Sequence, residues 1–255
     1  MSDNDSLKTV SRSISVLKLF SPNEREFTLT EFQNRLGISL SSLQRILSTL
    51  TKGGFLEKNE ATKTYRLGLE LYFLGNLVES HSQLISVSKE EMNRLNEVTQ
   101  ETVTLNVIHG NQRRCIGYVL AKHELTTLAF ISNESPLYAG ASAKVLLANI
   151  PEHEQKNILE EIELQRITEY TTIDKKELEN ELRRIKERGY AITESERVLG
   201  VYAVSSPLMD RFGNVLAGIT LTIPSVRVEK DNRDNYIYLV QDCARRISGK
   251  LGFKA

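Results

Sequence analysis

Two short helical segments joined by a single glycine place the strongest constraint on how this chain folds. In each segment apolar residues recur every three or four positions, as on one face of an α-helix: Leu29, Phe32 and Leu36 in the first, and Leu43, Ile46, Leu47 and Leu50 in the second. Gly37 lies between them and permits the positive φ of a sharp turn. Thr28, with Glu31 as capping-box partner, is placed to cap the first helix, and Ser39 the second. The pattern predicts two helices packed across a tight turn.

The second of these helices has a distinctive polar face. It carries short polar side chains and one arginine, namely Ser41, Ser42, Gln44, Arg45, Ser48 and Thr49, and the sequence has no acidic residue between Gly37 and Gly54. A solvated helix face ordinarily mixes acidic with basic residues. A surface that meets phosphates and base edges excludes carboxylates. The face therefore favours a DNA-reading helix over the alternative, an αα-hairpin inside an ordinary core.

A hairpin pattern follows directly. Phe55 and Leu56 enter it, residues 59–62 form a polar tip, and Tyr65 and Leu67 leave it. Lys58 and Lys63 flank the tip, where we expect them to reach a phosphate or the adjacent minor groove. A strand pair directly after a DNA-reading helix is a wing, so residues 28–66 predict a winged helix-turn-helix that binds double-stranded DNA.

Composition limits the remaining classes of function. The 255 residues carry 33 basic and 33 acidic side chains, so the chain has no general affinity for polyanions, and the placement of individual cations must matter more. The sequence contains no apolar run of membrane-spanning length, and the polar N-terminus lacks the core of a signal peptide. Cys115 and Cys243 show no metal-type spacing. We expect a cytoplasmic protein with no membrane partner, metal or cofactor.

The rest of the chain predicts an α+β domain. Strand-like runs cover residues 102–109, 114–120, 125–131, 190–194, 202–208 and 215–223, and helical runs cover residues 87–99, 141–149, 152–161, 175–188 and 228–251. The turn signals Gly110–Asn111 and Gly213–Asn214 indicate antiparallel pairing. These strands, helices and turns together predict an antiparallel sheet flanked by helices.

One end of this sheet is a candidate ligand site. Gly140, Ala141, Ser142 and Ala143 open a helix with very small side chains, and the amide groups and dipole there suit a carboxylate. Close packing of the helix on the sheet would also explain small residues. Two threonines favour the ligand: Thr220 and Thr222 lie two apart on an apolar strand, so both hydroxyls face the same side.

Between the two regions runs an apolar seam. Leu67, Leu71, Leu74 and Val78 share one stripe, with Phe73 and Leu77 beside it. At ~25 cal/mol per Å² such a stripe is unfavourable in water. We predict a linker helix over residues 69–88 that pairs with a partner chain, with packing on its own DNA-binding domain as the alternative.

Several ordered motifs resemble the IclR family of bacterial transcriptional regulators over nearly the full chain. SRSISVLKLF is similar to the family's opening helix, LGISLSSLQRILSTLTKGGFLEK to its recognition helix and wing, and YRLGLELYFLG to its linker. ETVTLNVIHG, SPLYAGASAKVLLA, RGYAITESE and GVYAVSSPLMDRFGNVLAGITLT match its ligand-domain segments. The chain departs from the family at Gln33, Leu40 and Ser132.

The resemblance implies a bacterial, nucleoid-associated regulator whose ligand domain has a GAF-like fold. It also implies a homodimer or tetramer on a pseudo-palindromic operator. It divides the chain into a flexible tail (1–6), a winged helix-turn-helix domain (7–68), a linker and dimerisation helix (69–88) and an effector-binding domain (89–255). The predicted DNA contacts are Thr28, Ser39, Leu40, Ser41, Ser42, Gln44, Arg45, Lys58 and Lys63.

By the same resemblance, a small organic acid contacts Ala141, Ser142, Thr193, Ala203, Thr220 and Thr222. The family often has an acidic residue at Thr193 and a cysteine at Ala203, so the identity of the effector does not transfer. Leu128, Phe130 and Tyr138 are either pocket walls or core residues.

The expected function is therefore metabolite-controlled transcription of carbon-source catabolism genes. The alternative is a winged-helix regulator whose C-terminal domain only mediates assembly. An enzyme is not expected, because His81, His109, His123 and His153 are scattered and no nucleophile–base arrangement is evident. Lys144 follows Ser142 too closely for a Ser-x-x-Lys pair, and we expect it to face outward.

Overall fold

The computed structural model describes residues 5–21, 23–123 and 134–254. The chain divides between Ser82 and Gln83 into two compact units, each with its own core. Among the described residues, no helix has the length and apolar character needed to cross a lipid bilayer.

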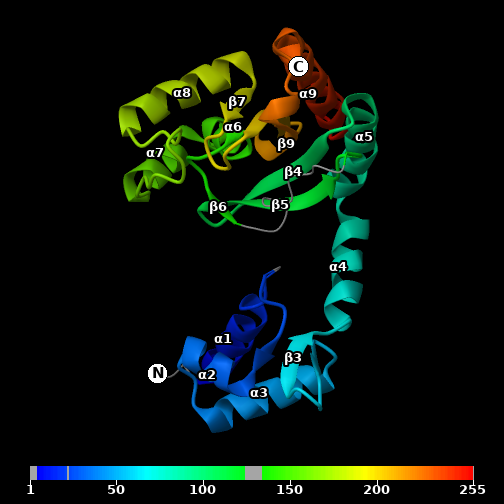
Figure 1. Cartoon of the computed structure of the whole chain (residues 1–255), viewed down its shortest axis with the longest axis vertical. Coiled ribbons are helices and arrows are strands. Elements are labelled where there is room, and N and C mark those ends of the chain that lie inside the picture. Colours follow the sequence, from blue (N-terminus) through cyan, green and yellow to red (C-terminus); the bar gives the residue numbers. More distant parts are fainter. Residues whose placement is uncertain (1–4, 22, 124–133, 255) are drawn as a thin grey trace. The chain divides into compact units, whose positions relative to one another are not determined.

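The N-terminal unit packs three helices against a small antiparallel sheet (Figure 1). Its elements are α1 (Asp5–Lys18), β1 (Phe27–Thr28), α2 (Leu29–Leu36), α3 (Leu40–Lys52), β2 (Leu56–Lys58) and β3 (Thr64–Leu67), with strand order β1-β3-β2. The predicted apolar stripes form the core, where Phe32, Leu43 and Leu47 are fully buried. The unit is the predicted winged helix-turn-helix, and α1 begins inside the segment predicted as a tail.

Local capping explains where the first of the two predicted helices starts and stops. Thr28 Oγ1 accepts from the Glu31 amide at 3.3 Å, while the Glu31 carboxylate accepts from the Thr28 amide at 2.7 Å. Gly37 ends α2 with φ 62°. Ser39 precedes α3, but its hydroxyl donates to Ser42 Oγ at 3.0 Å and, within the described residues, forms no side-chain cap. The predicted cap of α3 is therefore wrong.

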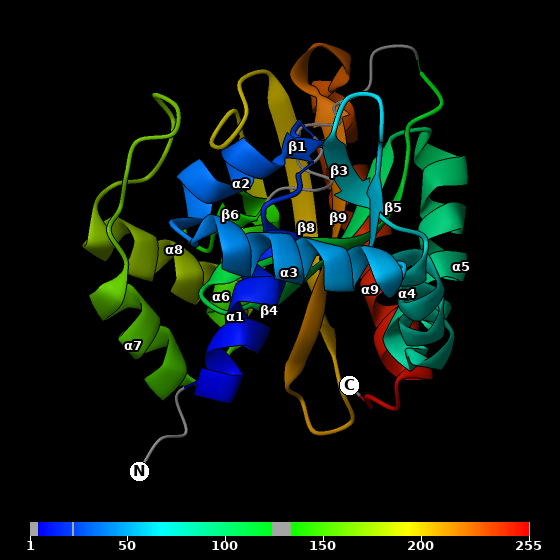
Figure 2. The same cartoon turned by 90° about the horizontal axis from the view of Figure 1, so that it is seen from below.

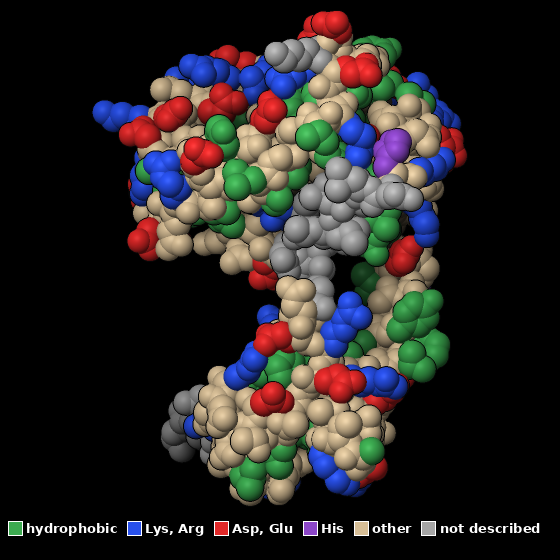
Figure 3. Space-filling view, in the orientation of Figure 1, with side chains coloured by type: hydrophobic (Ala, Val, Ile, Leu, Met, Phe, Trp, Pro, Cys, Tyr) green, Lys and Arg blue, Asp and Glu red, His purple; other side chains and the backbone are tan. Residues whose placement is uncertain are grey.

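The predicted linker helix is two helices rather than one. α4 spans Glu70–His81 and α5 spans Gln83–Thr99, and between them Ser82 takes an extended conformation (φ −87°, ψ 103°). α4 exposes most of its apolar side chains, including Tyr72, Phe73, Leu77 and Val78. Figure 3 shows hydrophobic side chains gathered on the surface over α4.

The C-terminal unit is an antiparallel sheet with helices on both faces (Figure 1). Its described strands run in the order β6-β5-β4-β9-β8-β7. They are β4 (Thr102–His109), β5 (Gln112–Val119), β6 (Ser135–Pro136), β7 (Ala191–Glu194), β8 (Val201–Met209) and β9 (Val215–Pro224). The strand predicted over residues 125–131 lies outside the described residues.

Helices α5 and α9 (Arg233–Lys250) cover one face of this sheet, and α6 (Ala141–Asn149), backed by α8 (Lys175–Arg188), covers the other, with α7 (Glu152–Glu161) beside α8 (Figure 1). The last helix starts later than predicted, because two 3₁₀ turns, Ser225–Arg227 and Lys230–Asn232, precede it.

The two faces of the sheet differ in chemistry, and this difference positions the site. Toward α5 and α9, the central strands present apolar side chains such as Leu105 and Leu221, all buried. Toward α6, the same strands present Thr104, Asn106 and Thr220, which are also buried although polar. Because side chains alternate along a strand, one apolar and one polar face result from the same sequence pattern.

Candidate functional sites

The predicted DNA-reading face of α3 is open to solvent. Ser41, Gln44 and Arg45 are exposed, Ser42 is half-buried, and Leu40 at the start of the helix is 44% exposed. The opposite side of α3 holds the helix in the core through Leu43, Ile46 and Leu47. Figure 2 looks onto α3, and no other described element of the N-terminal unit covers it from this side.

Beside this face lies a groove between α1 and α3 that sequence reasoning missed. The described residues that line it include Arg12 and Ser13 of α1 with Ser42, Arg45 and Thr49 of α3, and none of them is acidic. Arg12 therefore adds a second guanidinium next to Arg45. Arg12 carries no signal of this role in the local sequence, because the packing of α1 on α3 is not visible there.

The wing tip differs electrostatically from the expectation. Lys58 Nζ lies 2.9 Å from Glu60 Oε1, and Lys63 Nζ lies 2.9 Å from Glu60 Oε2. Hydrogen bonds from the two ammonium groups lower the pKa of Glu60 to about 2. Both lysines flank the tip as predicted, but each contacts a carboxylate, so a DNA phosphate has to compete with Glu60 for them.

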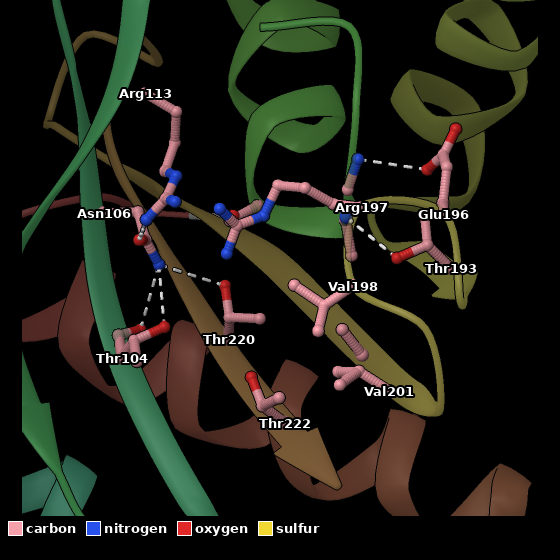
Figure 4. A pocket seen from close by; sticks show the side chains of 14 residues that line it. Thr104, Asn106, Arg113, Thr193, Glu196, Arg197, Val198, Val201, Thr220 and Thr222 are labelled. Carbon is pink, nitrogen blue, oxygen red and sulfur yellow. Dashed lines mark hydrogen bonds between the residues drawn. The ribbon is translucent and has the colours of Figure 1, made fainter. Parts of the chain in front are cut away.

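A pocket in the C-terminal unit brings together all six residues predicted to contact an effector. It lies between the polar face of the sheet, the start of α6 and the segment between β7 and β8 (Figure 4). Its volume is about 40 Å³. The predicted residues in its wall are Ala141, Ser142, Thr193, Ala203, Thr220 and Thr222, and the further ones are Thr104, Asn106, Arg113, Gly140, Glu196, Arg197, Val198 and Val201.

A continuous hydrogen-bond network orients the polar wall. Asn106 Nδ2 donates to Thr104 Oγ1 at 2.9 Å and to Thr220 Oγ1 at 3.2 Å. Arg113 donates from Nη1 to Asn106 Oδ1 at 2.8 Å and from Nε to Ser135 Oγ, also at 2.8 Å. Figure 4 shows this network reaching from β5 across β4 to β9. These hydrogen bonds hold the guanidinium of Arg113 in one orientation, and the residue is only 2% exposed.

A second guanidinium, that of Arg197, enters the same pocket from the segment between β7 and β8. In Figure 4 the side chains of Arg113 and Arg197 extend toward each other. Burial, and next the positive charge of Arg113, lower the pKa of Arg197 to about 10. Burial also lowers the pKa of Arg113. Arginine is always charged at neutral pH, so two cations lie in a pocket that the sequence predicted without either of them.

The start of α6 is only partly available as an anion site. The Gly140 amide donates to Glu196 Oε2 at 3.0 Å, and the Ala141 amide donates to Thr193 Oγ1 at 3.1 Å. These two amides are satisfied within the protein, contrary to the expectation of a fully exposed helix start. The amides of Ser142 and Ala143 belong to the first turn, which has no carbonyl partner inside the helix.

The expected orientation of Lys144 is wrong. Its side chain faces inward: the residue is 5% exposed and forms an ion pair with the buried carboxylate of Glu196. Of the two alternatives for Tyr138, pocket wall or core, the structure shows the core: it packs beneath α6, and its hydroxyl donates to the Gln165 carbonyl at 3.1 Å. Leu128 and Phe130 lie outside the described residues. Among those that are described, no cluster of His, Cys, Asp and Glu has the arrangement of a metal site.

Models of known protein families match the sequences of both units. The family model described as the IclR helix-turn-helix domain matches residues 9–60. The model described as the C-terminal domain of the bacterial transcriptional regulator IclR matches residues 77–249. The HTH-type transcriptional regulator KdgR of Escherichia coli is 30% identical over 249 residues, covering 98% of this chain and 94% of KdgR.

Two solved structures share the fold. The IclR transcriptional regulator from Alicyclobacillus acidocaldarius superposes with a TM-score of 0.88 at 23% identity, covering 96% of this chain and 99% of that one. An IclR homologue from Microbacterium hydrocarbonoxydans, complexed with 4-hydroxybenzoate, superposes with a TM-score of 0.84 at 20% identity, covering 95% and 98%. The chain belongs to the IclR family of DNA-binding transcriptional regulators, which are not enzymes.

Proposed function

We propose that this regulator reads a pseudo-palindromic operator through α3 and is controlled by a small organic acid bound in the pocket beside α6. Its target genes encode the breakdown of a carbon source, where such acids arise as intermediates. The observation that carries the proposal is the pocket itself, a buried space in which cationic and hydroxyl groups converge.

The DNA contacts follow from the exposed face of α3. Ser41, Ser42 and Gln44 face the base edges, while Arg45 contacts a phosphate. Lys58 and Lys63 of the wing add contacts to the backbone once they leave Glu60. Thr28, Ser39 and Leu40, at the starts of the two helices, complete the contact set.

The proposed assembly is a homodimer, alone or paired into a tetramer. The exposed apolar side chains of α4 include Tyr72, Phe73, Leu77 and Val78, each more than half exposed. An exposed surface of this kind marks an interface. A symmetric pair of chains would place two α3 helices about one helical turn of DNA apart, ~34 Å, which is the spacing a palindromic site requires.

The pocket supports an acid effector for physical reasons. Buried guanidinium groups and the amide dipoles at the start of α6 stabilise negative charge in a medium that screens it weakly. Thr220 and Thr222 add hydroxyls on the same wall. The homologue complexed with 4-hydroxybenzoate shows that an IclR-type protein can be obtained with a carboxylic acid bound. Coupling of such a ligand to DNA binding needs only ~1–3 kcal/mol.

The alternative, a C-terminal domain that serves assembly alone, predicts a filled cleft. The observed cavity of about 40 Å³ exceeds the ~10–15 Å³ that one water needs. Its wall also carries polar side chains, among them Asn106, Thr220 and Thr222, so the ligand-binding role is the better supported of the two.

The proposal is tested by selecting the operator from random DNA and then measuring operator affinity with and without candidate acids. An effector shifts both the operator affinity and the melting temperature of the full chain. Thr220→Val with Thr222→Val is expected to abolish both responses. Thr99→Val, on α5 and outside the pocket wall, is the matched control and is expected to retain them. An acid response that survives the double valine variant contradicts the placement of the site.

A further inference from the structure

The groove between α1 and α3 carries two arginines that have no carboxylate partner. Arg12 of α1 and Arg45 of α3 both line it, and its described lining includes no acidic residue. In the part of the chain that the structure describes, neither arginine forms an ion pair or a side-chain hydrogen bond. Arg35 and Arg66 of the same unit differ, because each pairs with a glutamate. The groove therefore presents two cations to solvent without a counter-charge from the protein.

The packing of α1 on the core brings the two arginines together. Val16 of α1 is fully buried, and Arg12 lies one helical turn before it on the same face of the helix. On α3 the buried Ile46 lines the groove, next to Arg45. Figure 2 shows α1 and α3 side by side. The hydrophobic contacts that hold α1 in place thus also set the position of Arg12, which is half-buried.

A serine hydroxyl adds a hydrogen-bond donor to the groove. Ser42 Oγ accepts from Ser39 Oγ at 3.0 Å, and among the described residues its own proton has no acceptor. The hydroxyls of Ser13 and Thr49 differ, because each donates to a carbonyl group of its own helix at 2.9 Å. Ser42 is therefore free to donate to an anion that lies beside the two arginines.

A DNA phosphate is the anion that best fits this groove. Guanidinium groups bind phosphate oxygens through paired, charge-assisted hydrogen bonds. The groove lies beside the face of α3 that carries Ser41 and Gln44, and a recognition helix in the major groove is flanked by the sugar–phosphate backbone. Its volume of about 190 Å³ is more than ten times the ~10–15 Å³ that one water needs, so a phosphate group has room.

We propose that this groove is a phosphate seat, in which Arg12 and Arg45 together hold one backbone phosphate of each operator half-site and Ser42 donates a further hydrogen bond. The inference rests on the proposed reading of DNA by α3 and adds a contact from a different helix. Phosphate contacts set the register and orientation of a protein on the duplex. Because Arg12 belongs to α1, the seat fixes the angle at which α3 enters the major groove.

Variants of Arg12 test the seat by fluorescence anisotropy of the full chain on its selected operator. Arg12→Gln is expected to weaken binding about tenfold, as the loss of one charge-assisted hydrogen bond does. The salt dependence of its binding should be shallower by about one unit, and Arg12→Lys, which keeps the charge, should restore the slope. Thermal melting of Arg12→Gln should be unchanged, because no ion pair among the described residues is lost.

Lys18→Gln is the matched control. It removes an exposed cation from the other end of α1, outside the described lining of the groove. This variant is expected to bind the operator with the affinity and the salt dependence of the unmodified chain.

A neutral methylphosphonate, placed at each backbone position of the operator in turn, identifies the phosphate. At one position in each half-site it is expected to cost the unmodified chain about a hundredfold in affinity, because both arginine contacts are lost. At that position it should cost Arg12→Gln and Arg45→Gln only about tenfold each, because one contact is already absent. Inorganic phosphate should compete with the operator no better than chloride at equal ionic strength, which separates a DNA phosphate from a free anion.

The outcomes separate this inference from the proposed function. Unchanged binding in Arg12→Gln, with weakened binding in Arg45→Gln, overturns the seat and leaves the reading of DNA by α3 in place. Sensitivity of the two variants to different phosphates also overturns the shared seat. Competition by inorganic phosphate that disappears in Arg12→Gln assigns the groove to a free anion and overturns it too. If neither variant changes operator binding, both the seat and the proposed DNA-reading face are wrong.

Discussion

The buried ion pair between Lys144 and Glu196 gives a quantitative test of how the start of α6 is built. Both side chains are nearly inaccessible, at 6% and 5% exposed. Lys144→Met keeps the approximate length and volume of the side chain but leaves the Glu196 carboxylate buried, with a hydrogen bond from the Gly140 amide and no cation from α6. Removing one partner of a buried pair is far more costly than removing the pair, since a charge is left without compensation.

The expected loss is ~3–5 kcal/mol in the free energy of unfolding of the C-terminal unit. For a domain of this size, ~2–4 °C of melting temperature corresponds to each kcal/mol, so the transition falls by roughly 6–20 °C. Differential scanning calorimetry of the full chain measures it. Adding Glu196→Gln to Lys144→Met removes the stranded charge and is expected to restore most of the loss.

Lys156→Met is the matched control. Its ion pair with Glu152 on α7 spans 2.8 Å, but both side chains are mostly exposed. Exposed pairs contribute little, because water and salt screen them. We expect no resolvable change in melting temperature. The reasoning is refuted if Lys144→Met melts like Lys156→Met, or if the added Glu196→Gln does not restore stability.

Three further outcomes are expected. Glu60→Gln frees the two wing lysines and should tighten operator binding and steepen its salt dependence by about one unit, measured by fluorescence anisotropy; an unchanged slope argues against wing contacts. Burial raises the pKa of Cys243 to about 12, so its thiol should resist iodoacetamide at pH 8 until the protein unfolds, as peptide mass spectrometry will show; rapid alkylation of the folded chain would contradict this. Gly68→Ala would place a Cβ 2.0 Å from the carbonyl oxygen of Gly54 and should destabilise the N-terminal unit in calorimetry, whereas Gly75→Ala, with open space around its Cβ, should not.

The N-terminal unit was predictable because its signals are local. Phe32 and Leu43 follow the helical period, and Gly37 marks a turn whose positive φ the structure shows. The break at Ser82 was not predictable in the same way. No proline or glycine marks it, and the residues around it are polar on both sides. Helical periodicity alone therefore predicted one continuous helix across Ser82, where the structure has an extended backbone.

The pocket was predictable in part. Alternation along one strand identified Thr220, and the same signal exists at Thr104 and Asn106, which alternate with apolar residues on β4. Only the pairing of β4 with β9, which sets Thr104 opposite Thr220, brings these groups together. That register depends on contacts far apart in sequence.

The charged residues of the pocket left weaker signals. Arg113 sits in the run Gln112–Arg113–Arg114, which has the composition of a solvated strand end. Arg197 lies in an irregular segment with no periodic pattern. Lys144 was expected to face solvent, because the rest of its helix is mostly apolar. In the structure α6 is buried on nearly all sides, so almost none of its surface faces solvent.

The central claim, that α3 inserts its carboxylate-free face into DNA, is tested most directly by the salt dependence of operator binding in Arg45→Ala. The account predicts weaker binding and a slope of log affinity against log salt that is shallower by about one unit, since one phosphate contact is lost. Arg114→Ala, in the C-terminal unit, is expected to bind as the unmodified protein does. An Arg45→Ala variant with unchanged affinity and slope would contradict the account.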